Sequence, residues 1–386
     1  MHDESGALLA GLTVLDLSQF LSGPYCSLRL HDLGARVIKV ERPGDGDLSR
    51  RLYLSDTEVG GDSTIFHAIN RGKESLALDL KSPADLAFLT KLVQKADVLI
   101  QNFRPGVIER LGLGYEQLRA INPGLVYASI SGYGEVGPWV MRPGQDLLAQ
   151  ARSGVMWLNG DDDQGPVPFG LAIADMLAGA NTCQGILAAL VRRGLSGTGA
   201  HVQTSLLESL VDFQFEVLTT HLNDGRRPPQ RSGIRSAHAY LSAPYGVYPA
   251  SDGYLAIAMA PIGQLQDHLN LAALAPYRDD AKAWFGERDA IKRIIAAHIV
   301  GNTIDHWLGL LEPADIWCAK VLDWPELLAS DGFRLLDMLQ TVSRDDGVTI
   351  GTTRCPVRID GRRPAVDRAA PLVGEHSDRI RAEFDA

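Results

Sequence analysis

The sequence predicts an α/β fold with a parallel sheet, followed by a second and smaller domain. Short apolar segments of strand character alternate with helical segments through the first half of the chain. This alternation is typical of βαβ units, whose strands pair in parallel. A polar linker rich in Gly and Pro, Asn223–Gly233, then separates this pattern from a different one. The length of 386 residues also suits two domains.

The first region is expected to alternate strands and helices in chain order. Gly34 closes the first helix, and Ser82 followed by Pro83 is a favoured helix start. The expected strands are Leu12–Leu17, Arg36–Glu41, Ser75–Leu80, Asp97–Gln101 and Leu125–Ile130, and the expected helices are Gly23–Leu33, Ser82–Lys95 and Tyr115–Ile121.

The second half of the chain contains a strand and a long helix before the linker, and a separate domain after it. The expected elements before the linker are the strand His201–Ser205 and the helix Leu206–Leu222. Beyond the linker we expect a hairpin over Gly246–Ile257 that turns at Ser251–Gly253, then helices near Gln264–Leu271, Asp289–Ile299 and Ile304–Leu311.

The segment from Gly170 to Arg193 is the most unusual part of the chain. Apolar residues recur in it at helical spacing, and between Ala174 and Val191 its only charge is Asp175. The face that carries Asp175 consists mainly of small residues, which predicts a helix buried on both sides. Two interpretations of Asp175 stand at this point. It is either a helix N-cap, or a nucleophile or base beside a groove that small side chains keep open.

Composition and cysteine usage exclude several classes of function. The 37 basic and 47 acidic residues give a net charge of −10, and no basic stripe of the kind that binds nucleic acid is present. The four cysteines lie far apart in the sequence, so a structural zinc site is not expected. Such sparse use of cysteine is typical of proteins in a reducing cytoplasm. Asp175, Asn181 and Gln184 argue against a membrane span in the longest apolar run.

Familiar catalytic motifs are absent, and this leaves the loops after the strands as the candidate site. The chain lacks a GxxxxGK[ST] phosphate loop, a dinucleotide fingerprint, a GxSxG elbow and a histidine metal motif. Open α/β sheets bind ligands at the carboxyl ends of their strands. Arg42, Arg104 and Arg110 follow predicted strands, and together they suggest a shared site for an anion.

Taken in order, segments along nearly the whole chain resemble the class III CoA-transferase family, also called the CaiB/BaiF family. The segments that carry the resemblance are Gly11–Leu17, Gly34–Asp47, Asn70–Lys81, Ala96–Gly106, Ser131–Gly134, Ser196–Leu206 and Pro371–His376. The resemblance implies a large, Rossmann-like parallel-sheet domain built from both chain ends, with a smaller α+β domain inserted between them. We therefore expect residues 1–222 and 341–386 in the large domain, and the linker and small domain at 223–340.

The resemblance also implies an interlocked homodimer and a catalytic role for Asp175. In the family, a carboxylate at this position attacks an acyl-CoA thioester, and the chain then carries CoA as an aspartyl thioester before an acceptor acid takes it. Asp175 must be ionised for this, which an ordinary Asp pKa and a helix N-terminus favour. We expect CoA and a carboxylic acid as substrates, no tightly bound cofactor and no metal. Nucleic acid and membrane are not expected as partners, and the expected location is the cytoplasm.

By resemblance, CoA and the acyl group lie along the loops that follow the strands. Phosphate contacts are expected from Arg42, Lys81 and Arg110, and an apolar surface from Leu78 and Phe103. The full set of expected CoA- and substrate-binding residues is Leu21, Ser22, Arg42, Leu78, Asp79, Leu80, Lys81, Asn102, Phe103, Arg104, Arg110, Arg142, Gly144, Gln145 and Asp146.

Departures from two branches of the family narrow the expected reaction. The α-methylacyl-CoA racemases need a His where this chain has Gln145, and an acid in a small-domain loop that here reads Ala258–Gln264 without one. Glutamine cannot act as a general base, so racemisation is disfavoured. Formyl-CoA transferases have Gln where this chain has Leu21 and a glycine run where it has Met259–Gln264, which disfavours formate and oxalate. The expected function is CoA transfer, with an acyl-CoA racemase or epimerase and a non-catalytic acyl-CoA-binding protein as alternatives.

Overall fold

The computed structural model describes residues 7–364 and 366–385, which form two compact units. Unit 1 comprises the chain up to Ala149, Ala172–Phe213 and the chain from Leu335 onward. Unit 2 comprises Gln150–Leu171 and Gln214–Arg334. These boundaries differ from the expected ones at 222/223 and 340/341, and they place an additional segment, Gln150–Leu171, in unit 2.

Hydrogen bonds that each involve at least one main-chain group explain why that segment belongs with unit 2. Arg231 of the expected linker donates from Nη1 to the Asn159 carbonyl at 2.6 Å. The Asp162 N–H donates to the Ser232 carbonyl at 3.1 Å, and the Ser236 N–H donates to Asp161 Oδ1 at 2.6 Å. Most of these contacts use main-chain groups, which every sequence carries, so the composition of the linker does not reveal them.

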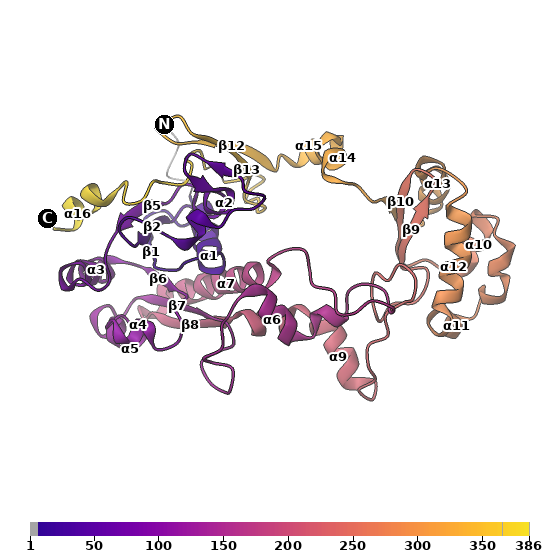
Figure 1. Cartoon of the computed structure of the whole chain (residues 1–386), viewed down its shortest axis with the longest axis horizontal. Coiled ribbons are helices and arrows are strands. Elements are labelled where there is room, and N and C mark those ends of the chain that lie inside the picture. The colour runs from indigo at the N-terminus through magenta and orange to yellow at the C-terminus, as the bar shows by residue number, and fades with distance from the viewer. Residues whose placement is uncertain (1–6, 365, 386) are drawn as a thin grey trace. The chain divides into compact units, whose positions relative to one another are not determined.

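Unit 1 is built on a six-stranded parallel sheet (Figure 1) with the order β5-β2-β1-β6-β7-β8. The central strand β1 pairs with β2 on one side and β6 on the other, with Val14 opposite both Val37 and Val98. This order reverses direction at β1, so the ligand-binding edge of the fold lies at the carboxyl ends of β1 and β6. The strands are β1 (Thr13–Asp16), β2 (Arg36–Glu41), β5 (Glu74–Ala77), β6 (Val98–Gln101), β7 (Val126–Ser131) and β8 (Ala200–Ser205).

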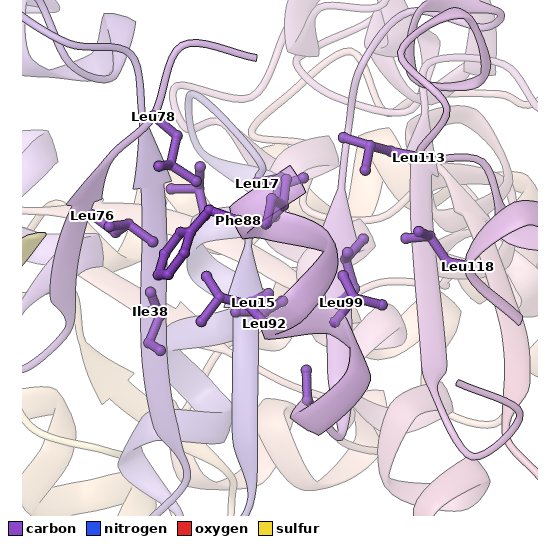
Figure 2. Close-up of a cluster of buried hydrophobic side chains, with 14 of the residues drawn as sticks. Leu15, Leu17, Ile38, Leu76, Leu78, Phe88, Leu92, Leu99, Leu113 and Leu118 are labelled. Carbon is purple, nitrogen blue, oxygen red and sulfur yellow. The ribbon is translucent and has the colours of Figure 1, made fainter. Parts of the chain in front are cut away.

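Helices cover both faces of the sheet. On one face, α3 (Pro83–Lys95), capped by Ser82, packs Phe88 and Leu92 against Leu15, Ile38 and Leu76 (Figure 2). On the other face, α1 (Ser22–Asp32) and α7 (Ile173–Ser196) pack around Val14, Val37 and Ile100. Strands buried on both faces read as continuous apolar runs, and this is why the sequence predicts them well.

The remaining elements of unit 1 include α2 (Thr64–Asn70), α4 (Val107–Arg110), α5 (Tyr115–Ile121), α8 (Leu206–Phe213) and α16 (Ser377–Asp385), the short strands β3 (Glu58–Val59), β4 (Asp62–Ser63), β12 (Leu339–Ser343) and β13 (Thr349–Thr353), and the 3-10 turn Leu48–Arg51.

The last helix, α16, packs against the first strands of the chain. Ile380 is fully buried in the same core as α3, and the Ala77 N–H donates to Ser377 Oγ at 3.0 Å. Arg36 binds the Glu383 carboxylate at 2.6 Å. The two ends of the chain therefore share one hydrophobic core.

Unit 2 has its own core around a three-stranded antiparallel sheet and several short helices. Leu255, Ile291 and Ile295 are fully buried in it. Its elements include α9 (Phe215–Asn223), β9 (Gly246–Ala250), β10 (Gly253–Ile257), α10 (Ile262–His268), α11 (Ala281–Gly286), α12 (Arg288–Ile299), α13 (Ile304–Leu311), β11 (Cys318–Lys320) and α14 (Trp324–Ala329), with 3-10 turns at Val155–Trp157, Ala272–Tyr277 and Glu312–Ala314. Two helices, α6 (Asp146–Ser153) and α15 (Asp331–Leu336), cross a unit boundary.

One expected helix is wrong in its extent. The segment Leu206–Leu222 forms two helices, α8 and α9, which are interrupted at Gln214. The side-chain amide of Gln214 donates to the Ser153 carbonyl at 3.2 Å, and Gln214 begins the part of the chain that belongs to unit 2. A tertiary contact therefore divides a segment whose local pattern is helical throughout.

Among the described residues, α7 is long and apolar enough to cross a membrane by length and composition alone. Its contacts give another reason for that composition, since Ala178, Cys183 and Ile186 are buried in the core of unit 1. A core helix of a folded domain passes the same test.

Candidate active site

The start of α7 is capped by a residue from another helix. The N-cap position, Ala172, offers no side-chain acceptor. Instead, Oδ2 of Asp146, the first residue of α6, accepts the N–H groups of Ala174 at 2.7 Å and Asp175 at 3.1 Å. The interpretation of Asp175 as the N-cap is therefore wrong. Asp175 occupies the third position of the helix, and its carboxyl group takes no part in capping it.

The Asp175 carboxyl lies half-buried beside the first residue of α1. The Ser22 hydroxyl forms a hydrogen bond with it. Burial and, to a lesser extent, the negative charge of Asp146 together raise the pKa of Asp175 to about 7, although the Ser22 hydrogen bond acts in the opposite direction. The expected ordinary Asp pKa is therefore wrong, because the carboxyl is partly removed from water and lies near the charge of Asp146.

The small residues of α7 serve helix packing. A Cβ atom added to Gly179 would lie 2.5 Å from the Ser22 carbonyl oxygen and 2.9 Å from a ring carbon of Tyr25. This spacing allows α1 and α7 to approach closely, and it carries Ser22 to the Asp175 carboxyl. Ala178 is buried against Ile130 and Leu206 instead, and the buried Thr182 hydroxyl contacts the Thr204 hydroxyl of β8. The expected open groove along this face is therefore wrong.

α7 was expected to be buried on both sides, but apolar residues on its second side are exposed. Val191 is 69% exposed and Leu195 is 88% exposed. The helix is thus buried on one side only within its own unit.

A side-chain amide joins the loops at the point where the sheet reverses direction. Asn102 follows β6, and Gln19 lies in the loop between β1 and α1. Asn102 Oδ1 accepts the Gln19 N–H at 2.8 Å, and its Nδ2 donates to the Gln19 carbonyl at 2.7 Å. Leu21 is the N-cap of α1, so this pair of bonds holds the loop that presents Leu21 and Ser22.

The expected cationic contacts lie on exposed loops at this same edge of the sheet. Arg42 follows β2 and pairs with Asp45 at 2.9 Å while its side chain stays 61% exposed. Lys81 follows β5, and Arg104 follows β6. Arg110 is the last residue of α4, and Arg142 follows β7 along the chain. The five cationic residues expected at the site are all exposed: Arg42, Lys81, Arg104, Arg110 and Arg142.

Several residues expected to contact the ligand instead pack in the core or form hydrogen bonds within the chain. Leu78 is 1% exposed within the core, so its side chain cannot offer a surface to a nucleotide, and that expectation is wrong. Leu80 and Phe103 pack partly against the same core. Asp79 lies on the surface, and its Oδ1 accepts the Lys81 N–H at 3.0 Å.

The loop before Asp146 runs close to the end of β7. A Cβ atom on Gly144 would lie 2.6 Å from the Gly132 Cα, so the two backbones touch only because both residues are glycine. Gln145 is exposed, and its Oε1 accepts the Leu147 N–H at 3.1 Å. This backbone contact sets where α6 begins and therefore where Asp146 lies.

Sequence reasoning missed a network of buried ions beneath these loops. Lys73 donates to Asp16 at 3.0 Å, and Lys39 pairs with Asp47 at 2.7 Å, with all four side chains at 1% exposure or less. Although burial alone would raise it, the Lys73 and Lys39 charges hold the pKa of Asp16 well below its usual value. Burial in turn lowers the pKa of Lys73 to about 8. The signal was present, since Asp16 and Lys39 each interrupt an apolar strand.

A second part of this network surrounds Arg50. Its guanidinium binds Glu41 at 2.8 Å and Asp62 at 3.0 Å. It also donates to the Pro371 carbonyl at 3.0 Å, which ties the C-terminal segment to the loop after β2.

No metal-binding group is evident in the part of the chain that the structure describes. No cluster of three or more His, Cys, Asp or Glu side chains there is arranged to hold an ion.

Comparisons with known proteins agree with this architecture. The chain matches the sequence model of CoA-transferase family III over residues 9–377. It is 33% identical to a succinate–glutarate CoA-transferase of Agrobacterium fabrum, with 98% of this chain and 96% of the relative covered. It is 35% identical to an acetyl-CoA:oxalate CoA-transferase of Acetobacter aceti (97% and 95% covered) and 34% identical to a succinyl-CoA:mesaconate CoA-transferase of Haloarcula hispanica (95% and 94% covered).

Solved structures resemble it over the same length. A CaiB/BaiF family protein from Brucella suis superposes with a TM-score of 0.82 at 31% identity, covering 98% of this chain and 99% of that one. The D175A mutant of Rv3272 from Mycobacterium tuberculosis gives a TM-score of 0.82 at 30% identity, covering 97% and 98%. The chain therefore belongs to CoA-transferase family III, as its sequence motifs predict, and it is an enzyme of the CoA-transferase type.

Proposed function

We propose that this enzyme moves CoA between an acyl-CoA thioester and a free carboxylic acid, with Asp175 as the nucleophile. The observation that carries the proposal is the arrangement around Asp175. Its carboxyl is released from helix capping by Asp146 and lies beside Ser22, at the ligand-binding edge of the sheet.

In the first half of the reaction, an Asp175 oxygen attacks the thioester carbonyl. The C–S bond breaks, and CoA leaves as a thiolate from the resulting mixed anhydride. The thiolate then attacks the Asp175 carbonyl of the anhydride. The donor acid departs with one oxygen that came from Asp175, and CoA remains on the enzyme as an aspartyl thioester.

In the second half, the acceptor carboxylate attacks the aspartyl thioester and releases CoA thiolate again. The thiolate attacks the acceptor carbonyl of the second anhydride. The new acyl-CoA leaves, and Asp175 is restored as a carboxylate that contains one oxygen from the acceptor. No proton, electron or water molecule is consumed.

The environment of Asp175 suits this role. A carboxylate held in a partly dehydrated place beside another negative charge is more basic than one in water, and basicity favours attack on a carbonyl. Since only the ionised form attacks, we expect activity to fall as the pH drops below about 7.

The exposed cations at the edge of the sheet support the expected binding of CoA. Arg42, Lys81, Arg104, Arg110 and Arg142 supply positive charge for phosphate groups, and Asn102 and Phe103 lie on the loop between them. The relatives are named for succinate, glutarate, oxalate and mesaconate. We propose a dicarboxylate as the acid substrate on this basis.

We also propose that the chain acts as an interlocked homodimer in the cytoplasm, with the small domain inserted in the large one. Exposed apolar side chains on α7 and α8 support an interface between copies. Val191, Leu195 and Phe213 are 69%, 88% and 45% exposed. Four free cysteines are consistent with a reducing compartment. Light scattering coupled to size-exclusion chromatography tests the dimer, and a monomer at micromolar concentration would contradict it.

An acyl-CoA racemase that uses Asp175 as a base is the second candidate. A pKa of about 7 suits a general base as well as a nucleophile. Gln145, however, is an amide where the racemases carry their second base. Incubation of a 2-methylacyl-CoA in deuterated water should therefore give no exchange at the α-carbon.

Transfer of an oxygen isotope distinguishes the three functions. We expect that turnover with an acceptor dicarboxylate labelled with ¹⁸O at both carboxyls, after digestion, gives a heavier peptide around Asp175. Asp175→Asn should neither exchange CoA nor take up label, whereas Asp163→Asn, which alters an exposed carboxylate, should do both. A racemase or a simple binding protein would leave Asp175 unlabelled, and active Asp175→Asn would refute the mechanism.

A further inference from the structure

Asp146 holds a position that neither its own helix nor its sequence neighbours explain. It is the first residue of α6 and is 5% exposed. Its Oδ2 accepts two N–H groups from a different helix, α7. Carboxylates at helix N-termini usually come from the helix itself or from the residue just before it.

The cap that Asp146 supplies determines which hydrogen-bond donors remain for the Asp175 carboxyl. The first N–H groups of a helix have no partner within the helix, and an Asp in the first turn is well placed to interact with them. Here Asp146 takes the N–H groups of Ala174 and Asp175. The Asp175 side chain instead forms a hydrogen bond with the Ser22 hydroxyl.

The charged groups around Asp175 can be named element by element. From α6 comes the Asp146 carboxylate, and from α1 comes the neutral hydroxyl of Ser22. Glu208 of α8 is engaged by the Ser205 hydroxyl. Thus the negative charge of Asp146 disfavours the ionised form of Asp175, and the hydrogen bond from the Ser22 hydroxyl favours it.

We propose that Asp146 is a positioning residue that fixes the first turn of α7 and destabilises the free Asp175 carboxylate relative to its uncharged acylated forms. This inference rests on the proposed function. When Asp175 becomes an anhydride or a thioester, it loses its charge and the repulsion from Asp146 disappears. Formation of the acyl-enzyme therefore relieves an electrostatic cost that the free enzyme carries.

Removal of the charge while the cap is retained tests the proposal. Asp146→Asn keeps a side-chain oxygen of the same reach that is able to accept an N–H, and Asp146→Ser keeps an oxygen acceptor of shorter reach; both lack the negative charge. We expect the acid limb of the pH profile of kcat/KM, near pH 7 in the wild-type enzyme, to move toward acid by about one pH unit in either variant. Either variant suffices if the other does not fold.

A second readout is independent of turnover rate. At equilibrium with an acyl-CoA, intact-protein mass spectrometry measures the fraction of chains that carry CoA covalently. This fraction should fall at least two-fold in the neutral variants, and it should stay at the wild-type level in Asp163→Asn, which alters an exposed carboxylate. Asp146→Ala, which loses the cap as well, should in addition lower the melting temperature.

The outcomes separate this inference from the proposed function. If the wild-type enzyme moves neither CoA nor ¹⁸O, the proposed function fails. If the wild-type enzyme does both, but the acid limb of the neutral variants coincides with it or moves toward alkaline pH, the role of Asp146 is refuted and the function stands.

Discussion

Replacement of Asp175 by Asn should make the protein more stable at alkaline pH. The ordinary pKa of an Asp, 3.8, applies to the unfolded chain, while burial and Asp146 raise the folded value to about 7. The folded protein therefore binds a proton between these values that the unfolded chain has lost. Stability from this group is fully present below pH 3.8, falls progressively as the pH rises toward 7, and is lost above 7. Asn is neutral at every pH and avoids that loss.

The magnitude follows from the displacement of the pKa. A shift from 3.8 to about 7 corresponds to at most ~4 kcal/mol of unfolding free energy. Because the side chain is only half-buried, solvent screening reduces this, and we expect a relative gain of ~1–3 kcal/mol for Asp175→Asn between pH 5 and pH 8. For a unit of this size the gain corresponds to a difference of roughly 3–8 °C in melting temperature.

The assay compares melting temperatures of the two proteins at several pH values. Circular dichroism or scanning fluorimetry at pH 5, 6, 7 and 8 gives the difference directly, and the difference should widen mainly between pH 5 and 7 and level off by pH 8. Asp163→Asn, which changes an exposed carboxylate, serves as the control and should show a constant difference. Parallel curves for Asp175→Asn and wild type would refute the reasoning, because they would mean that Asp175 carries no unusual charge cost.

The other predictions concern packing, the ion network and CoA binding. Gly179→Ala should cost about 1–3 kcal/mol and lower kcat, because the new Cβ would lie 2.5 Å from the Ser22 carbonyl and force α1 away from α7. Unchanged stability and activity would contradict the close approach. Lys73→Met should cost about 3–5 kcal/mol in urea unfolding, because it leaves Asp16 buried without its partner, while Lys73→Met with Asp16→Asn should recover much of the loss. A double variant as unstable as the single one would speak against the pair. Arg42→Ala should raise KM for the acyl-CoA three- to ten-fold with little change in kcat, and the effect should shrink at high salt. An effect on kcat alone would place Arg42 in the chemical step instead.

Local patterns were enough to predict most of the sheet and its covering helices. The strand Arg36–Glu41 and the helices Tyr115–Ile121 and Ile304–Leu311 have the expected bounds. Ser82 caps α3 as its sequence indicates. Such features depend on neighbours three or four residues away, which a sequence displays directly. The helix Leu206–Leu222 was predicted less well, because its interruption depends on Gln214 reaching Ser153.

By itself, the sequence determined the alternation of strands and helices, the family and the one charge on the apolar helix. These follow from periodicity and from motifs in a set order, both of which are local properties of the chain. Only the tertiary structure decided what Asp175 is near. The cap from Asp146, the hydroxyl of Ser22 and the resulting pKa of about 7 join residues up to 153 positions apart in sequence. This is because the groups that perturb a carboxylate are those closest to it in space, and helix packing at Gly179 brings them there.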